Sequence, residues 1–247
     1  MTPREVLETA IQRAYAAFAH VARPMSLDAS PLRDAKTILR DLTAAPLRQL
    51  SPEQIGYFAS CAMTTVGTAD DYRHFLPRIL ELAVRSGSAF GTEPESVANK
   101  LVYAEWSTWD EAERAAVIDV FETATAAAIE KRLGYEPDAE AWLCGLSRLG
   151  IAPAPWLARW RDAALPAAGV QLAHLVTSII PADGEAFTAY WEEVNSAIKA
   201  EIANWLFEPA TRQQLSTTRA LAAEEDRWLI DLALQALGHG ELSATRH

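Results

Sequence analysis

The segment at residues 70–83 holds the densest group of side chains that could bind a ligand or transfer a proton. Asp70, Asp71, Arg73 and His74 lie within five consecutive positions. Residues four apart share a helix face, so Asp70 and His74 could act as an acid–base pair or supply two metal ligands. No third ligand lies nearby at a usable spacing, and the same pattern is typical of a solvated face lined by ion pairs. We therefore expect a solvent-facing helix start, with no metal site.

Pro77 interrupts the hydrogen bonding of this expected helix. Because proline has no N–H to donate to the carbonyl of Arg73, we expect a kink there. The freed carbonyl beside Arg73 and His74 could face a groove. The alternative to a solvated face is therefore a pocket at the kink.

Two tryptophans flank a short turn in the segment AEWSTWDEAE at residues 104–113. Trp106 and Trp109 are accompanied by Glu105 and Asp110, and such a corner could bind a cation or a basic side chain. The pattern is more typical of tryptophans that pack two helices together, with acids in the first turn of the second helix. We favour packing and keep the corner as a candidate binding site.

The second half of the chain is rich in tryptophan. Trp156 and Trp160 lie four residues apart, next to Arg159 and Arg161, and could form a partly exposed aromatic edge. A further apolar series at spacings of 4, 3, 4, 4 and 3 predicts one stripe of a long helix at 185–207, facing the core. The members of this stripe are Phe187, Trp191, Val194, Ile198, Ile202 and Trp205.

Catalytic and cofactor-binding motifs are missing from the sequence. It contains no GxSxG, HExxH, CxxC, Walker A loop or GxGxxG set. His174 lies in the apolar run VQLAHLVTSII, which is typical of a hydrogen-bonded core histidine. Cys61 and Cys144 have apolar helical surroundings and are expected to be buried free thiols. We name no catalytic residue and no cofactor.

Helix starts predict an all-α fold. Thr2, Ser51, Thr92 and Thr108 each precede Glu or Gln by three residues, as in a capping box. No segment alternates with β-strand periodicity, so we expect no sheet. Short connections favour stacked antiparallel helices, either an irregular α/α superhelix of HEAT or armadillo type or a two-lobed bundle. The expected helices are 3–22, 31–42, 52–66, 71–86, 94–106, 109–132, 138–149, 155–165, 168–180, 185–207 and 217–237.

The length suits one all-helical domain over residues 1–247. A sub-lobe boundary is expected near 134–137, between 1–133 and 138–247, because a proline follows a helix stop there. Residues 134–247 carry 8 basic and 15 acidic groups, so this part holds −7 of the net charge of −11.

The acidic balance argues against nucleic acids and anionic membranes as partners and favours a basic protein partner or a cationic ligand. The most apolar stretch, 170–180, is too short and too polar to span a bilayer. Glu5 and Glu8 lie where a signal peptide would be apolar. We therefore expect a cytoplasmic protein.

The pieces YRHFLPRILELA and WLARW resemble segments of uncharacterised bacterial all-helical proteins of unknown function. The resemblance covers a modest part of the chain. It implies an all-helical fold and a bacterial origin, and it carries no activity or functional residue.

Together these patterns predict a protein-interaction module: an acidic helical scaffold, an adaptor, or an immunity- or regulatory-type protein that binds a protein partner, of which a basic one fits the charge. The alternative is an all-helical enzyme or small-ligand binder. Its pocket would lie near the helix start at Asp70–His74 and the corner at Trp106–Asp110.

Overall fold

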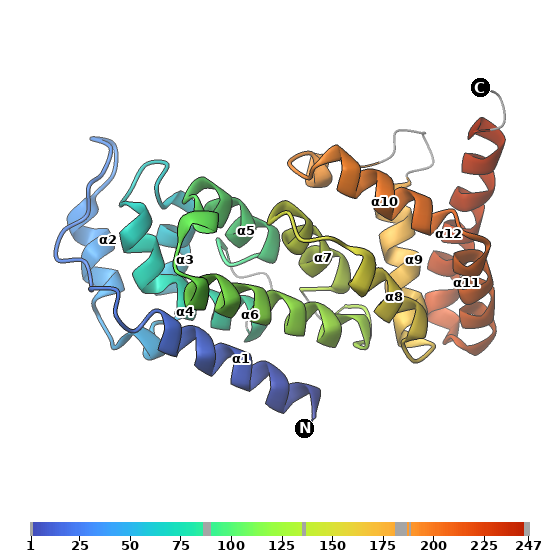
Figure 1. The fold of residues 1–247 in the computed structure, drawn as a ribbon, viewed down its shortest axis with the longest axis horizontal. Helices are drawn as coiled ribbons and strands as arrows, with labels where there is room; N and C mark the ends of the chain where they lie inside the picture. Colours follow the sequence, from blue (N-terminus) through green and yellow to red (C-terminus); the bar gives the residue numbers. More distant parts are fainter. Residues whose placement is uncertain (1, 86–89, 135–136, 181–186, 188, 245–247) are drawn as a thin grey trace. The chain divides into compact units, whose positions relative to one another are not determined.

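The computed structural model describes residues 2–85, 90–134, 137–180, 187 and 189–244, and these residues form α-helices, short 3-10 helices and connections. No β-strand occurs within these ranges, so the predicted all-α class is confirmed (Figure 1). The choice between a superhelix and a two-lobed bundle stays a prediction.

The chain divides into two compact units, Met1–Ala124 and Thr125–His247, and the division falls within one helix, α6. Of the boundary expected near 134–137, residues 135–136 lie outside the described part of the chain.

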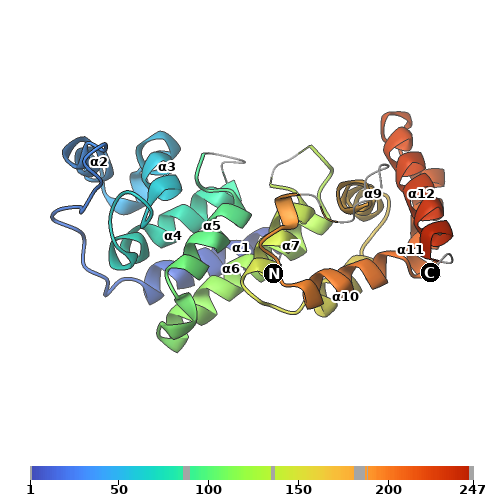
Figure 2. The ribbon, with the colours of Figure 1, turned by 90° about the horizontal axis from the view of Figure 1, so that it is seen from above.

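The first unit consists of short helices that each bury one face. α1 packs against α4, α3 packs between α2 and α4, and α5 packs against α4 (Figure 2). α4 contributes the centre of the core through Tyr72, Phe75, Leu76 and Ile79, and it continues through the buried Pro77. The elements are α1 (Pro3–Ala17), α2 (Ala35–Leu42), η1 (Leu47–Gln49), α3 (Pro52–Cys61), α4 (Ala69–Arg85), α5 (Pro94–Tyr103), η2 (Trp106–Thr108) and α6 (Glu111–Ile129).

Local capping explains where the first helices begin. Thr2 and Ser51 form complete capping boxes, and proline occupies the first turn of both helices. The N-cap positions expected at Thr92 and Thr108 are wrong. The N-cap of α5 is Glu93, one residue after the buried Thr92, and Thr108 belongs to η2.

The second unit is organised around α9, which packs against α7, α11 and α12 (Figure 1). This helix, expected at 168–180, is buried on most sides. The elements are α7 (Ala139–Arg148), α8 (Ala154–Asp162), α9 (Ala167–Ile179), η3 (Ala189–Trp191), α10 (Ser196–Leu206), α11 (Pro209–Leu221) and α12 (Glu224–Ala244).

Two expected helices of the second unit are divided. The single helix expected at 185–207, whose first residues lie outside the described part, is replaced by η3 and α10. Phe187 has a φ of 70°, and Asn195 caps α10 through its side chain. Extended backbone at Ala222 likewise separates α11 from α12 within the range expected as one helix.

A buried polar network joins α1, η1 and α4. The Glu81 carboxylate, 8% exposed, accepts hydrogen bonds from the Tyr15 hydroxyl at 2.6 Å and from Arg78 at 2.7 Å. Arg78 also donates to the Leu50 carbonyl at 2.8 Å, and the Arg48 guanidinium lies 3.7 Å from the centre of the Tyr15 ring. Burial alone would raise the pKa of Glu81, but these donors and the charge of Arg78 bring it below its usual value.

This network predicts that stability depends on pH through Glu81. Its folded-state pKa lies below that of an unfolded glutamate, about 4.3. The stabilisation is therefore complete above that pH and is lost as the pH falls through the folded-state pKa. Glu81→Gln should lower the free energy of unfolding at pH 7 by about 1–3 kcal/mol and should flatten its decline below pH ~4.

Urea denaturation at a series of pH values measures this effect. Glu192→Gln, at an exposed position, is the matched control and should follow the wild-type pH dependence. If the free energy of unfolding fell with pH in parallel for Glu81→Gln and wild type, Glu81 would not be the source of this pH dependence.

The contact between α9 and α11 gives a second prediction. A Cβ added at Gly169 would lie 2.6 Å from the Thr218 Cβ, far inside normal contact distance. Gly169→Ala should therefore lower the free energy of unfolding by about 1–3 kcal/mol. Gly238→Ala on α12, where the nearest atom lies 4.0 Å away, should raise it by about 0.5–1 kcal/mol. Thermal or urea denaturation compares the two, and equal effects would refute this packing.

Candidate functional site

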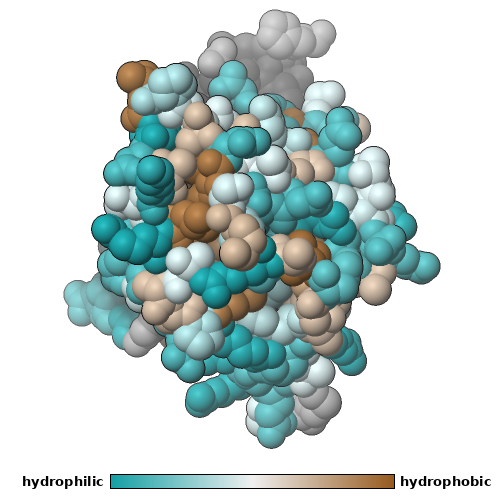
Figure 3. Space-filling model, turned by 90° about the vertical axis from the view of Figure 1, so that its left-hand side faces the viewer, coloured by the Kyte–Doolittle hydropathy of each residue, from teal (hydrophilic) through white to brown (hydrophobic). Residues whose placement is uncertain are grey.

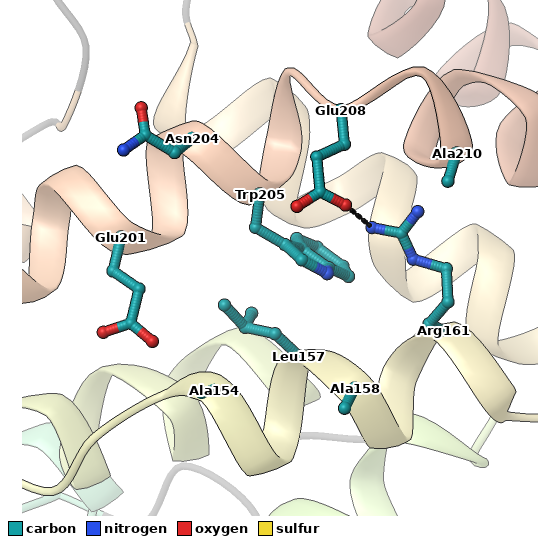
Figure 4. Close-up of a pocket in the computed structure, with 9 residues that line it drawn as sticks. All are labelled: Ala154, Leu157, Ala158, Arg161, Glu201, Asn204, Trp205, Glu208 and Ala210. Carbon is teal, nitrogen blue, oxygen red and sulfur yellow. Dashed lines mark hydrogen bonds and ion pairs between the residues drawn. The ribbon is translucent and has the colours of Figure 1, made fainter.

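A groove between α8, α10 and the start of α11 is the candidate site of the second unit. It has a volume of about 540 Å³, within the range of ligand-binding clefts. Apolar side chains form its floor and polar ones its rim, as Figure 4 shows. The lining residues are Ala154, Leu157, Ala158, Arg161, Glu201, Asn204, Trp205, Glu208 and Ala210.

The floor of the groove is part of the core. Leu157 and Trp160 are the buried residues of α8, and Trp205 of α10 is 9% exposed. The Trp160 and Trp205 rings pack with their centres 6.5 Å apart. Because the floor packs against the core, the groove exists without a ligand.

The charges of the groove are unequal. The Arg161 guanidinium lies 4.8 Å above the Trp205 ring and donates to Glu208 at 3.0 Å and to the Thr211 hydroxyl at 3.2 Å. Glu201 reaches from α10 towards the start of α8, without an ion pair to another described residue (Figure 4). One guanidinium faces two carboxylates, so the groove is negative.

The predicted aromatic edge lies beside this groove. Trp160 is fully buried and donates its indole N–H to the Ala168 carbonyl at 2.8 Å, and Trp156 is partly buried. Neither lines the groove. The aromatic residue that does is Trp205, which the apolar stripe assigned to the core. The sequence placed Arg161 next to Trp156 and Trp160, but it gave no sign of the contact with Trp205 or of Glu201 and Glu208.

The residues of the predicted cluster at the start of α4 make separate contacts. Asp71 accepts from the Thr68 backbone at 2.7 Å and so caps the helix. Asp70 pairs with Arg73 at 2.8 Å, and His74 Nδ1 lies 3.0 Å from the Val21 carbonyl oxygen. Asp70 and Arg73 therefore pair with each other, whereas Asp71 and His74 contact backbone groups outside the cluster. Whether any of these residues binds a partner stays a prediction.

The second predicted cluster meets the first through Arg73. Its guanidinium lies 5.1 Å from the centre of the Trp109 ring and donates to both oxygens of Glu113 at 2.8 Å. Trp106 is buried, and Trp109 donates its indole N–H to the Ala104 carbonyl at 3.2 Å.

The acids of this corner remain outside that contact. Glu105 has a φ of 53° and is exposed, as is Asp110. The residue that connects the two clusters is Glu113, which lies 40 residues from Arg73 and was not singled out from the sequence.

A further cluster, not predicted from the sequence, surrounds Glu140 in the second unit. The Glu140 carboxylate accepts from the Ser178 hydroxyl and from the Trp191 indole at 2.9 Å. His174 Nε2 lies 3.5 Å from it and 3.1 Å from Asp138. Instead of lying in the core, the His174 side chain is 36% exposed.

The two carboxyls of this cluster differ in pKa. Burial raises the pKa of Glu140. Burial acts in the same direction on Asp138, but hydrogen bonds from His174 and the Ala141 backbone outweigh it and lower the pKa. Unlike carboxyls are used in acid–base sites and also occur in structural ion-pair networks. Over the described part of the chain, no group of three or more His, Cys, Asp or Glu side chains is arranged to hold a metal ion.

The surface at the α2 end of the first unit is mostly hydrophilic, unlike the apolar floor of the groove. Hydrophilic side chains cover most of this face, and hydrophobic ones form small areas between them (Figure 3). Exposed apolar residues in the preceding connection include Met25 and Leu32. Single exposed apolar side chains are normal on protein surfaces and indicate no binding site by themselves.

Comparisons of the chain with protein-family models, with curated proteins and with solved structures yield no match. Among the helices of the described ranges, none is both long and apolar enough to cross a membrane.

The Arg73–Glu113 pair yields a prediction about stability. The Glu113 side chain is 1% exposed, so Arg73→Ala would leave a buried carboxylate without its main partner. The expected loss in the free energy of unfolding is about 3–5 kcal/mol. Arg13→Ala is the matched control, because Arg13 pairs with Asp119 at the surface and should cost less than ~1 kcal/mol.

Urea denaturation of both variants measures the difference. The double variant Arg73→Met, Glu113→Leu removes both charges and should recover part of the loss. A similar small loss for Arg73→Ala and Arg13→Ala would show that the pair does not hold the first unit together.

Proposed function

We propose that the chain is a protein-interaction module whose second unit binds a basic, partly apolar peptide segment of a partner protein. The observation that carries this proposal is the preformed groove between α8 and α10, with an apolar floor and a carboxylate that has no ion-pair partner among the described residues.

The floor favours a partner with an apolar anchor. Leu157, Ala158 and Trp205 offer aliphatic and aromatic contact in an open groove. A leucine-sized side chain that leaves water to occupy such a floor gains about 1.5–3 kcal/mol when fully buried. This term gives affinity without requiring the groove to rearrange.

The charges favour a cationic segment. Glu208 already neutralises Arg161, so the carboxylate of Glu201 sets the sign of the groove. The wider surroundings add to it, since residues 134–247 carry 8 basic and 15 acidic groups. A lysine or arginine next to the apolar anchor would be attracted during encounter and held by Glu201.

The alternative pocket at the Asp70–His74 helix start and the Trp106–Asp110 corner has less support. Arg73, Glu113 and Trp109 contact one another there, and Arg73 is already bonded to two carboxylates. A ligand at that point would have to compete with these internal contacts.

Binding of short labelled peptides to the full chain tests the proposal. The probe is a peptide of repeated Lys-Leu-Ser units. One control peptide has Glu in place of each Lys, and another has Ser in place of each Leu. Fluorescence anisotropy should show binding of the first peptide and at least ~10-fold weaker binding of both controls, a difference of about 1.4 kcal/mol.

Matched variants locate the site. Glu201→Lys reverses the charge inside the groove, and Glu193→Lys makes the same change at an exposed position outside it. We expect Glu201→Lys to weaken the Lys-Leu-Ser peptide at least ~10-fold and Glu193→Lys to change it less than ~3-fold. Equal effects of the two variants, or no binding at peptide concentrations of about 1 mM, would overturn the proposal.

A further inference from the structure

The first unit contains a separate pocket between α3, α5 and the connection that precedes α5. Its volume is about 370 Å³, which suits a small molecule rather than a protein side chain alone. Two aromatic side chains, Phe90 and Tyr103, line it while remaining 67% and 61% exposed. Their ring faces are available to a ligand.

The pocket wall is held in place by a close backbone contact. A Cβ at Gly91 would lie 2.5 Å from the Gly56 carbonyl oxygen and 2.7 Å from the Ser60 nitrogen, and Gly91 has a φ of 81°. Only glycine fits both the conformation and the distance. The connection carrying Phe90 and Glu93 is therefore fixed against α3.

The pocket contains one cation and one anion, both on or beside α5. The Lys100 ammonium donates to the Ala62 carbonyl at 2.8 Å, and burial lowers its pKa. The Glu93 carboxylate accepts from the Gly91 N–H at 2.9 Å. An ammonium has three donors and a carboxylate about four acceptor positions, so both groups keep capacity for a ligand.

We propose that this pocket binds a small zwitterion with an apolar or aromatic side chain, an amino acid or a dipeptide. The ligand's carboxylate would pair with Lys100, its ammonium with Glu93, and its side chain would pack against Phe90 and Tyr103. Ser60, Ser96 and Asn99 supply further polar groups along the wall.

The positions of the two residues along α5 suit the dipeptide. Glu93, the N-cap of α5, and Lys100 are seven positions apart, so their Cα atoms lie about 10.5 Å apart along the helix axis. An extended dipeptide spans about 7 Å, and an ion pair at each end adds about 2.8 Å. The sum, about 12–13 Å, is within reach of two long side chains, whereas a single amino acid requires both to bend inward.

Calorimetric titration of the full chain tests the inference. The probes are L-leucyl-L-phenylalanine, L-phenylalanine, and the N-acetylated and C-amidated forms of the dipeptide. Binding of the dipeptide or of the amino acid, with at least ~10-fold loss on acetylation and on amidation, would support a zwitterion site and identify which ligand it prefers. Unchanged binding of the modified forms, or no binding of any probe at about 1 mM, would overturn it.

Variants place that binding in this pocket. Lys100→Met and Glu93→Gln should each weaken the preferred probe at least ~10-fold, while Lys36→Met and Glu53→Gln, at exposed positions outside the pocket, should not. Because Lys100 also bonds to the backbone, Tyr103→Ala at the exposed rim serves as a second test and should weaken binding ~5-fold or more without loss of folding. Wild-type affinity in Tyr103→Ala and Glu93→Gln would exclude the site.

Discussion

The first unit depends on one buried carboxylate, that of Glu113. An unpaired charge at that depth costs several kcal/mol, and Arg73 offsets the cost with two hydrogen bonds of 2.8 Å. Both hydrogen bonds come from Arg73 Nη2, while Nη1 donates to Asp70, so the guanidinium holds the start of α4 against α6. The same guanidinium lies over Trp109, whose ring also contacts Phe18 edge-on at 5.9 Å. One ion pair thus fixes the ends of three helices.

The second unit stabilises a buried carboxylate differently. Glu140 contacts no arginine within the described part of the chain and relies on the hydroxyl of Ser178, the indole of Trp191 and the imidazole of His174. Trp191, which donates its indole N–H to Glu140, lies in the short η3 turn instead of in a continuous helix. The residue that donates a hydrogen bond to Glu140 therefore lies where the long helix predicted from the apolar stripe is interrupted.

What the sequence predicts well is local. Thr2 and Ser51 cap their helices through neighbours three residues away, and such signals are independent of the rest of the fold. The apolar series around Trp191 identified four buried residues, whereas Phe187 and Ile198 are only partly buried. It did not identify their helix, because spacing does not record the φ of 70° at Phe187. The pairing of Arg73 with Glu113 spans 40 residues, and Glu201 faces its groove only because α8 and α10 pack together. Neither contact leaves a local pattern.

The net charge alone does not indicate a ligand, because many of the acids contact other residues of the chain. Glu81, Glu113 and Glu140 are used internally, where they accept hydrogen bonds that hold helices together. Glu208 matches Arg161, so the sign of the groove is set by Glu201. The pocket between α3 and α5 contains one carboxylate, that of Glu93, and one ammonium, that of Lys100, so its charges balance. Since the charges next to a bound ligand select it more strongly than total charge does, the groove should favour cations and the pocket should favour molecules that carry both signs.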